Sequence, residues 1–225
     1  SLVAATQAIT DGGLITLCAG THSVQSGIAL FVENITMQGT GRENTILTAW
    51  NNSPIITSHR EQPTGLHLSD LTCIFSSDQT AIAITPLSQE EPSVTLQRVS
   101  FQATDPQQDQ NTLAIQIRGL ENREQQSVRL DNIAIQDTQN AVVLQNLFSA
   151  EVLNTSITKT SGTALSMENT REALIRGNQW ETQRGGLQIL RTGPQGYLIL
   201  NNRIVQSQEA ATEIPYKGIN YISTP

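Results

Sequence analysis

The chain has 225 residues, of which 37% are hydrophobic and 15% charged, so it is neither a disordered polyelectrolyte nor a coiled coil. Its formal net charge of -7 opposes nucleic-acid binding, because contacts to phosphate need a concentrated lysine and arginine surface. No apolar run reaches the roughly 20 residues that cross a bilayer, and the chain does not open on a signal-peptide pattern. One domain with a continuous core is the expected organisation.

The first expected element is a helix within residues 1–12, with one apolar face formed by Leu2, Val3, Thr6 and Ile9. An elongated repeat exposes apolar core and strand edges at its ends, so it needs caps. We therefore expect this helix to cap the N-terminal end, residues 14–209 to form the repeat, and residues 210–225 to form a C-terminal cap or tail.

One phrase recurs along the chain: two apolar residues separated by one position, then a polar turn residue, then an apolar anchor three positions later. It occurs at Leu30, Val32, Asn34 and Met37; Leu66, Leu68, Asp70 and Cys73; Val94, Leu96, Arg98 and Phe101; Val128, Leu130, Asn132 and Ile135; Ala150, Val152, Asn154 and Ile157; Ala173, Ile175, Gly177 and Trp180; and Leu198, Leu200, Asn202 and Val205.

The anchors at positions 135, 157, 180 and 205 are 22, 23 and 25 residues apart, the length of one turn of a β-solenoid. Alternation with period two puts one set of side chains on one face of a strand, and a strand repeated every turn stacks on its own copy. The sequence therefore predicts an all-β parallel β-helix. Helical repeats are the competing interpretation. The alternation of apolar and polar residues, the many β-branched residues and the Gly and Asn residues at the turns all oppose it.

The positions of the apolar residues within each repeat predict which side chains form the interior. Leu130, Val152, Ile175 and Leu200 are expected in one continuous core, with Phe101 and Trp180 as buried anchors. The turn residues are expected to form a corner ladder whose side chains hydrogen-bond to stacked backbone, with members Asn34, Asp70, Asn132, Asn154 and Asn202.

Three segments, residues 14–22, 34–41 and 45–47, resemble the first coils of the pectin-lyase-like superfamily. The resemblance implies a right-handed, single-stranded parallel β-helix. The superfamily includes pectate lyases, polygalacturonases, pectin methylesterases, epimerases, phage tailspikes and non-catalytic adhesins, so the fold does not define a reaction. The polygalacturonase motifs are absent, and Asp137 in Gln-Asp-Thr lacks the companion motif of the methylesterases.

Outward positions beside the apolar pairs form two columns across the coils: His67, Thr95, Arg129, Glu151, Leu174 and Ile199; and Ser69, Gln97, Asp131, Leu153, Arg176 and Asn201. Because stacked strands lie about 4.8 Å apart, the columns predict one charged patch of Arg129, Asp131, Glu151 and Arg176. Two carboxylates can divide the acid and base or nucleophile roles of a glycosidase. An arginine beside Ca²⁺-binding acids can serve uronate β-elimination. Solvated ion pairs without catalytic function are the favoured interpretation.

Trp50, His59 and His67 are the candidates for ligand contacts. Neither the histidines nor the two cysteines, Cys18 and Cys73, have metal-ligand spacing, and both cysteines are expected to be buried. No metal site and no cofactor is predicted, and Ca²⁺ enters only with the lyase alternative. Longer turns near residues 49–65, 86–92, 102–112 and 118–127 are the expected surroundings of a ligand groove.

The favoured function is a secreted or cell-surface β-helix that binds a polysaccharide, or presents a recognition surface, without catalysis. Two alternatives stay open: a carbohydrate-active enzyme, either a polysaccharide lyase or a glycoside hydrolase, and a structural stalk or spike segment. The expected partner is a polysaccharide or another surface molecule, and the sequence leaves the oligomeric state open.

Overall fold

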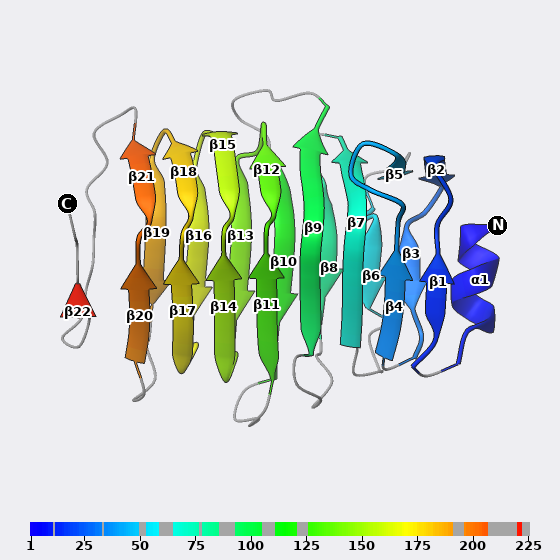
Figure 1. Ribbon diagram of the computed structural model, residues 1–225, viewed down its shortest axis with the longest axis horizontal. Coiled ribbons are helices and arrows are strands. Elements are labelled where there is room, and N and C mark those ends of the chain that lie inside the picture. Colours follow the sequence, from blue (N-terminus) through cyan, green and yellow to red (C-terminus); the bar gives the residue numbers. More distant parts are fainter. Residues whose placement is uncertain are drawn as a thin grey trace.

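The alternating apolar residues form parallel strands that wind into a right-handed β-helix, which confirms the predicted fold (Figure 1). The computed structural model describes residues 1–10, 12–32, 34–49, 53–58, 65–76, 78–85, 93–104, 111–120, 126–190, 196–206 and 220–221. Each full turn contributes one strand to a small sheet and either two short strands or one long strand to a large sheet.

The small sheet lies behind the large one in Figure 1. Its strands are β3 (Ile28–Leu30), β6 (Ile56–Ser58), β8 (Thr80–Ile84), β10 (Leu113–Arg118), β13 (Asn140–Gln145), β16 (Thr163–Glu168) and β19 (Gly185–Leu190).

The large sheet has a lower and an upper row of strands (Figure 1). The lower row consists of β1 (Leu14–Thr16), β4 (Asn34–Gln38), β11 (Ser127–Asp131), β14 (Ser149–Leu153), β17 (Glu172–Arg176) and β20 (Gly196–Leu200). The upper row consists of β2 (Gly20–Val24), β5 (Thr45–Ala49), β12 (Ala134–Gln136), β15 (Ser156–Thr160), β18 (Gln179–Thr182) and β21 (Arg203–Gln206). Two long strands, β7 (Gly65–Phe75) and β9 (Val94–Ala103), span both rows, and β22 (Asn220–Tyr221) pairs with β20.

The N-terminal helix α1 (Leu2–Ala8) lies at the first end of the solenoid (Figure 1). The Ser1 hydroxyl caps it by accepting a hydrogen bond from the backbone N–H of Ala4 at 3.3 Å. Leu2, Val3 and Ile9 pack against the core. Within the described segments, α1 is too short to cross a membrane, and no other helix there is long and apolar enough to do so.

Inward side chains stack in register from coil to coil. The central column of the lower row runs through Met37, Leu68, Leu96, Leu130, Val152 and Ile175, each at most 1% exposed. Phe101 and Trp180 are buried anchors in the upper row, as predicted. Cys73 is buried as well, whereas Cys18 is exposed, so the prediction for Cys18 was wrong.

The lower and upper rows meet at a corner where one residue per coil takes a positive φ. Its occupants are Asp70, Arg98, Asn132, Asn154, Gly177 and Asn201. Asn, Asp and Gly tolerate this left-handed conformation best, which explains most of the set. The predicted ladder is therefore confirmed only in part. Asn34 begins β4 opposite Gly65, and Asn202 lies one position past the corner. Asp70, Asn132 and Asn154 occupy the corner as predicted, but within the described residues their side chains bind other side chains and not the stacked backbone.

The amides that bind the stacked backbone sit one residue after the corner. Asn178 donates from Nδ2 to the carbonyl oxygen of Val152 at 2.9 Å, and its Oδ1 accepts from the N–H of Thr155 at 2.7 Å. Asn202 donates to the carbonyl oxygen of Ile175 at 2.8 Å. These amides, of which Asn178 is buried and Asn202 half-buried, pair backbone groups that the turn would leave unsatisfied.

In the last coil, the inward-pointing residues are shifted by one position from those predicted. Ile199, not Leu200, aligns with Ile175 and packs against the core, while Leu198 is 47% exposed and Leu200 aligns with Arg176. The prediction that Leu200 points inward was therefore wrong. Because side chains alternate with period two, a shift of one residue reverses every side chain of the strand.

Replacing Val152 with Asp is expected to destabilise the fold by several kcal/mol, because it buries an unpaired charge in the middle of the central column. Thermal melting followed by circular dichroism measures the loss. The matched control is Val143→Asp, an outward, half-buried position on β13, where we expect a much smaller shift. Equal melting temperatures for both variants would contradict the inward assignment of Val152.

Candidate functional site

The outer face of the lower row carries a charge lattice, defined here as Asp70, Arg98, Arg129, Asp131 and Glu151. Arg129 contacts Glu151 at 3.0 Å and Asp131 at 3.5 Å. Arg98 binds both carboxylate oxygens of Asp70, at 2.6 and 2.8 Å. The lattice is an alternating series of opposite charges across neighbouring coils.

The structure thus brings together three of the four residues predicted for the charged patch. Arg129, Asp131 and Glu151 lie on the adjacent strands β11 and β14. Arg176 lies one coil further on, exposed and aligned with Leu153, and no ion pair links it to the lattice among the described residues. Leu198 and Leu200 occupy the column positions predicted for Ile199 and Asn201.

Of the predicted ligand contacts, only His67 lies in the described part of the chain; Trp50 and His59 fall outside it. His67 stands on β7 in the outward column between Thr36 and Thr95. Burial, together with the positive charge of Arg98, lowers the pKa of His67, and Asp70 partly offsets this effect. Burial and the charge of Arg98 both favour the uncharged form of the imidazole.

A loop at residues 39–44 reaches over the large sheet and was not anticipated from the sequence. The carbonyl oxygen of Arg42 accepts a hydrogen bond from the Thr72 hydroxyl at 2.8 Å. The guanidinium of Arg42 donates a hydrogen bond to Asn132 Oδ1 at 3.2 Å. Burial and the neighbouring Arg98 lower the pKa of Arg42. Because the Arg42–Asn132 contact joins residues 90 positions apart, no local pattern indicates it.

An elongated hollow, the upper groove, crosses the outer face of the upper row. Its first part, about 360 Å³, lies beside Arg42 and Glu43 and has a polar floor that includes Ser100, Gln102, Gln136, Ser156 and Thr158. Its second part, about 380 Å³, shares Ser156 and Thr158 and continues past Gln179, Glu181 and Arg203. Strands β9, β12, β15, β18 and β21 lie side by side along the helix axis (Figure 1). Because the two parts of the groove are lined by residues of successive strands in this series, the groove follows the same axis.

Thr72, which also lines the upper groove, donates to the carbonyl oxygen of Arg42, but the five polar side chains of the floor named above are not used by the protein itself. Within the described residues, no hydrogen bond is found from the side chains of Ser100, Gln102, Gln136, Ser156 or Thr158. On the outer face of the small sheet, by contrast, Gln145 donates to Glu168 at 2.9 Å. The floor therefore presents free donors and acceptors to solvent.

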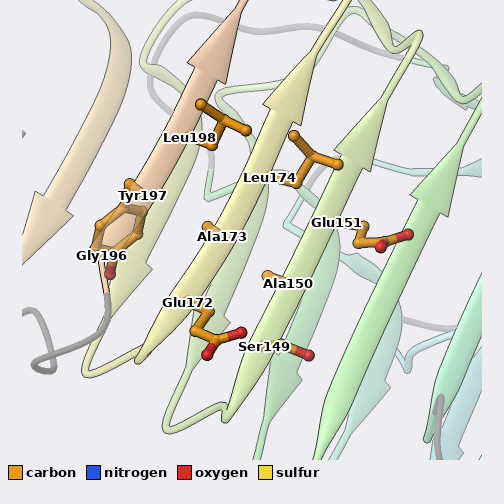
Figure 2. A pocket seen from close by; sticks show the side chains of 9 residues that line it. All are labelled: Ser149, Ala150, Glu151, Glu172, Ala173, Leu174, Gly196, Tyr197 and Leu198. Carbon is orange, nitrogen blue, oxygen red and sulfur yellow. The ribbon is translucent and has the colours of Figure 1, made fainter. Parts of the chain in front are cut away.

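A third hollow, about 430 Å³, lies on the lower row over β14, β17 and β20. Figure 2 shows Leu174 and Leu198 on its floor with the carboxylates of Glu151 and Glu172 beside them. Tyr197 also lines it, but the Tyr197 hydroxyl donates to the carbonyl oxygen of Thr170 at 2.7 Å, and burial raises its pKa to about 12. Tyr197 is thus held away from acid–base chemistry at neutral pH.

Among the residues that the structure describes, no group of three or more His, Cys, Asp or Glu side chains is arranged to hold a metal ion. The lattice carboxylates instead have protein partners, since Asp131 also accepts a hydrogen bond from Asn154 Nδ2 at 3.2 Å.

The sequence matches no protein-family model and no curated protein. Among solved structures, the chain is similar to the A-module of mannuronan C-5 epimerase AlgE6 from Azotobacter vinelandii, with a TM-score of 0.50 and 12% identity over 92% of this chain and 82% of that one. The likeness is one of fold. It agrees with the resemblance to the pectin-lyase-like superfamily that the first coils indicate.

Two further solved structures are more distant. The AlgE4 A-module of the same organism has a TM-score of 0.39 and 10% identity, covering 98% of this chain and 93% of that one. The ORF18 protein of Geobacillus virus E2 has a TM-score of 0.36 and 10% identity, covering 89% and 54%.

Replacing Asp70 with Asn is expected to lower stability at pH 7 by up to about 1 kcal/mol, the usual limit for an exposed ion pair. Hydrogen bonds from Arg98 hold the pKa of Asp70 below its usual value, so its stabilisation is present above the unfolded-state pKa of about 3.9 and is lost as pH falls through the lower folded-state pKa. Melting temperatures of both proteins should therefore differ at pH 7 and converge at about pH 2. Asn keeps the shape of the side chain and tolerates the positive φ.

The control for this pair is Arg98→Gln, made alone and together with Asp70→Asn. If the ion pair is the source of the effect, the second substitution adds little to the first. The same stability difference at pH 7 and at about pH 2 would contradict the assigned cause.

Proposed function

We propose that this protein is a secreted or cell-surface β-helix that binds a polysaccharide along the upper groove without catalysing a reaction on it. The observation that carries the proposal is the contrast between two outward surfaces. The charge lattice is paired within the protein, whereas the floor of the upper groove presents hydroxyl and amide groups that have no protein partner. A ligand rich in hydroxyl groups can replace the water that these groups bind and form hydrogen bonds with them.

The shape of the groove supports a polymer over a compact ligand. The two hollows share Ser156 and Thr158 and together extend over successive coils, from the overhanging Arg42 to Arg203 on the last upper strand. An extended chain can follow this direction, whereas a single sugar would occupy a small part of it. The AlgE6 module, whose name makes mannuronan its substrate, shares the fold alone, so the proposal rests on the groove.

Replacing Gln136 and Ser156 together with alanine is expected to weaken polysaccharide binding about tenfold, because two hydrogen bonds of roughly 0.5–1.5 kcal/mol each are lost. A glycan array first identifies a bound polymer, and affinity electrophoresis in that polymer then compares the variant with the parent. Gln116→Ala, outward on β10 of the small sheet, is the matched control and should bind normally. Equal losses in both variants would argue against the upper groove.

The enzyme alternative keeps one observation in its favour, which is that Arg129, Asp131 and Glu151 lie together and that Glu151 lines the hollow of Figure 2. Both carboxylates are engaged by Arg129, so neither is free to approach a glycosidic oxygen without breaking an ion pair. The geometry therefore favours an electrostatic role for the lattice over lyase or hydrolase chemistry.

Asp131→Asn and Glu151→Gln are expected to leave polysaccharide binding unchanged, and neither should alter the reducing ends or unsaturated products released from a panel of polysaccharides. Reducing-sugar and absorbance assays on the parent and on both variants measure this. Loss of a depolymerising activity in either variant, with unchanged melting temperature and binding, would establish the enzyme alternative instead.

A further inference from the structure

The charged side chains that line the upper groove include as many positive as negative groups among the described residues. Among its described lining residues, Arg42 and Glu43 stand at one end, and Glu181 and Arg203 at the other. Each end thus carries one positive and one negative group, and the floor between them carries no charge. Binding a polyanion needs a concentrated positive surface, which this groove lacks, and the net charge of -7 opposes a polyanion further.

The uncharged floor is made of groups that both donate and accept hydrogen bonds. Gln102 and Gln136 supply an amide N–H donor and a carbonyl acceptor, and Ser156 supplies a hydroxyl that does both. A sugar hydroxyl has the same dual capacity. The chemical match is therefore to an uncharged, hydroxyl-rich ligand.

The polar groups also recur from coil to coil. Ser100, Ser156 and Gln179 align in one outward column, which Ala134 interrupts, while Gln102, Gln136 and Thr158 align without interruption in the next. Neighbouring strands are about 4.8 Å apart, a spacing close to the length of one pyranose unit in an extended chain. Successive coils therefore offer similar contacts at the interval of successive sugars.

We infer that the ligand of the upper groove is an uncharged polysaccharide that lies along the helix axis, with successive sugar units on successive coils. This inference rests on the proposed polysaccharide-binding function and adds the charge class and the direction of the polymer.

Each contact in such a groove is weak. Phe101 and Trp180 belong to the lining strands, but their side chains point inward and are 1% and 2% exposed, so they offer no aromatic face to a sugar ring. Affinity must accumulate from many hydrogen bonds along the chain. It should rise with ligand length and level off once the ligand spans the coils from β9 to β21.

Isothermal titration calorimetry with defined oligosaccharides tests this inference. The uncharged probes are gluco-, manno- and xylo-oligosaccharides of two to eight units, and the anionic probes are oligomannuronate and oligogalacturonate of the same lengths. We expect at least one uncharged series to bind, with an affinity gain of about tenfold from three to six units. Binding should be unchanged between about 50 mM and about 500 mM NaCl, because no ionic contact contributes.

The possible outcomes separate the inference from the proposed function. Tighter binding of an anionic series, weakened by salt, would overturn the uncharged ligand and leave polysaccharide binding intact. Binding of an uncharged series with no dependence on length would overturn the axial arrangement. If neither the probes nor a full polysaccharide array shows any binding, the proposed function fails and the inference fails with it.

Variants tie the measured affinity to the groove. Thr158→Ala, in the middle of the floor, should weaken binding of the six-unit ligand about threefold or more, while Ser166→Ala, outward on β16 of the small sheet, should not. Melting temperatures of both variants should match the parent. Equal affinity of Thr158→Ala and the parent would place the ligand elsewhere on the surface.

Discussion

In-register stacking of parallel strands is the constraint on which the rest of this structure depends. Each residue of a coil lies beside its counterpart in the next, so a side chain that points inward once does so in every turn, as Leu130, Val152 and Ile175 show. The same rule acts on the outer face, where it turns single polar residues into continuous columns. Core and surface are thus set by one repeated pattern, and the corner amides Asn178 and Asn202 keep successive turns aligned by pairing their buried backbone groups.

The outer columns of the two rows have opposite characters. In the lower row, side chains of opposite charge pair with one another. Arg129 contacts both Asp131 and Glu151, so these carboxylates are already engaged within the protein. In the upper row, Thr72 donates to Arg42, but the side chains of Ser100, Gln102, Gln136, Ser156 and Thr158 make no hydrogen bond to the described part of the protein. Solvated ion pairs contribute little stability, whereas hydroxyl and amide groups that face solvent can exchange their bonds to water for bonds to a ligand.

The sequence predicted the fold and most of the inner columns, because alternation with period two is a local property that stacking makes cumulative. It failed where alternation is lost: Tyr197, Leu198, Ile199 and Leu200 are all apolar, so the phase of the last lower strand cannot be read from hydrophobicity. Three residues of the lower charge lattice, Arg129, Asp131 and Glu151, were predicted from the columns between paired apolar residues, whereas the Asp70–Arg98 pair was not predicted. The upper groove was missed for two reasons. Each of its strands has a single buried apolar anchor, so no alternation identifies the outward residues, and the contact of Arg42 with Asn132 joins residues 90 positions apart, so no repeat in the sequence indicates it.

The register of the upper row also determines how such a surface can change in size. Ile135, Ile157 and Trp180 stack at intervals of one coil, and each of these coils adds one row to the groove floor. Inserting or duplicating a whole coil would lengthen the groove by one row and leave every inward side chain in place. A change of one residue within a strand would instead exchange its inner and outer faces. The groove can therefore lengthen only in whole steps of one coil.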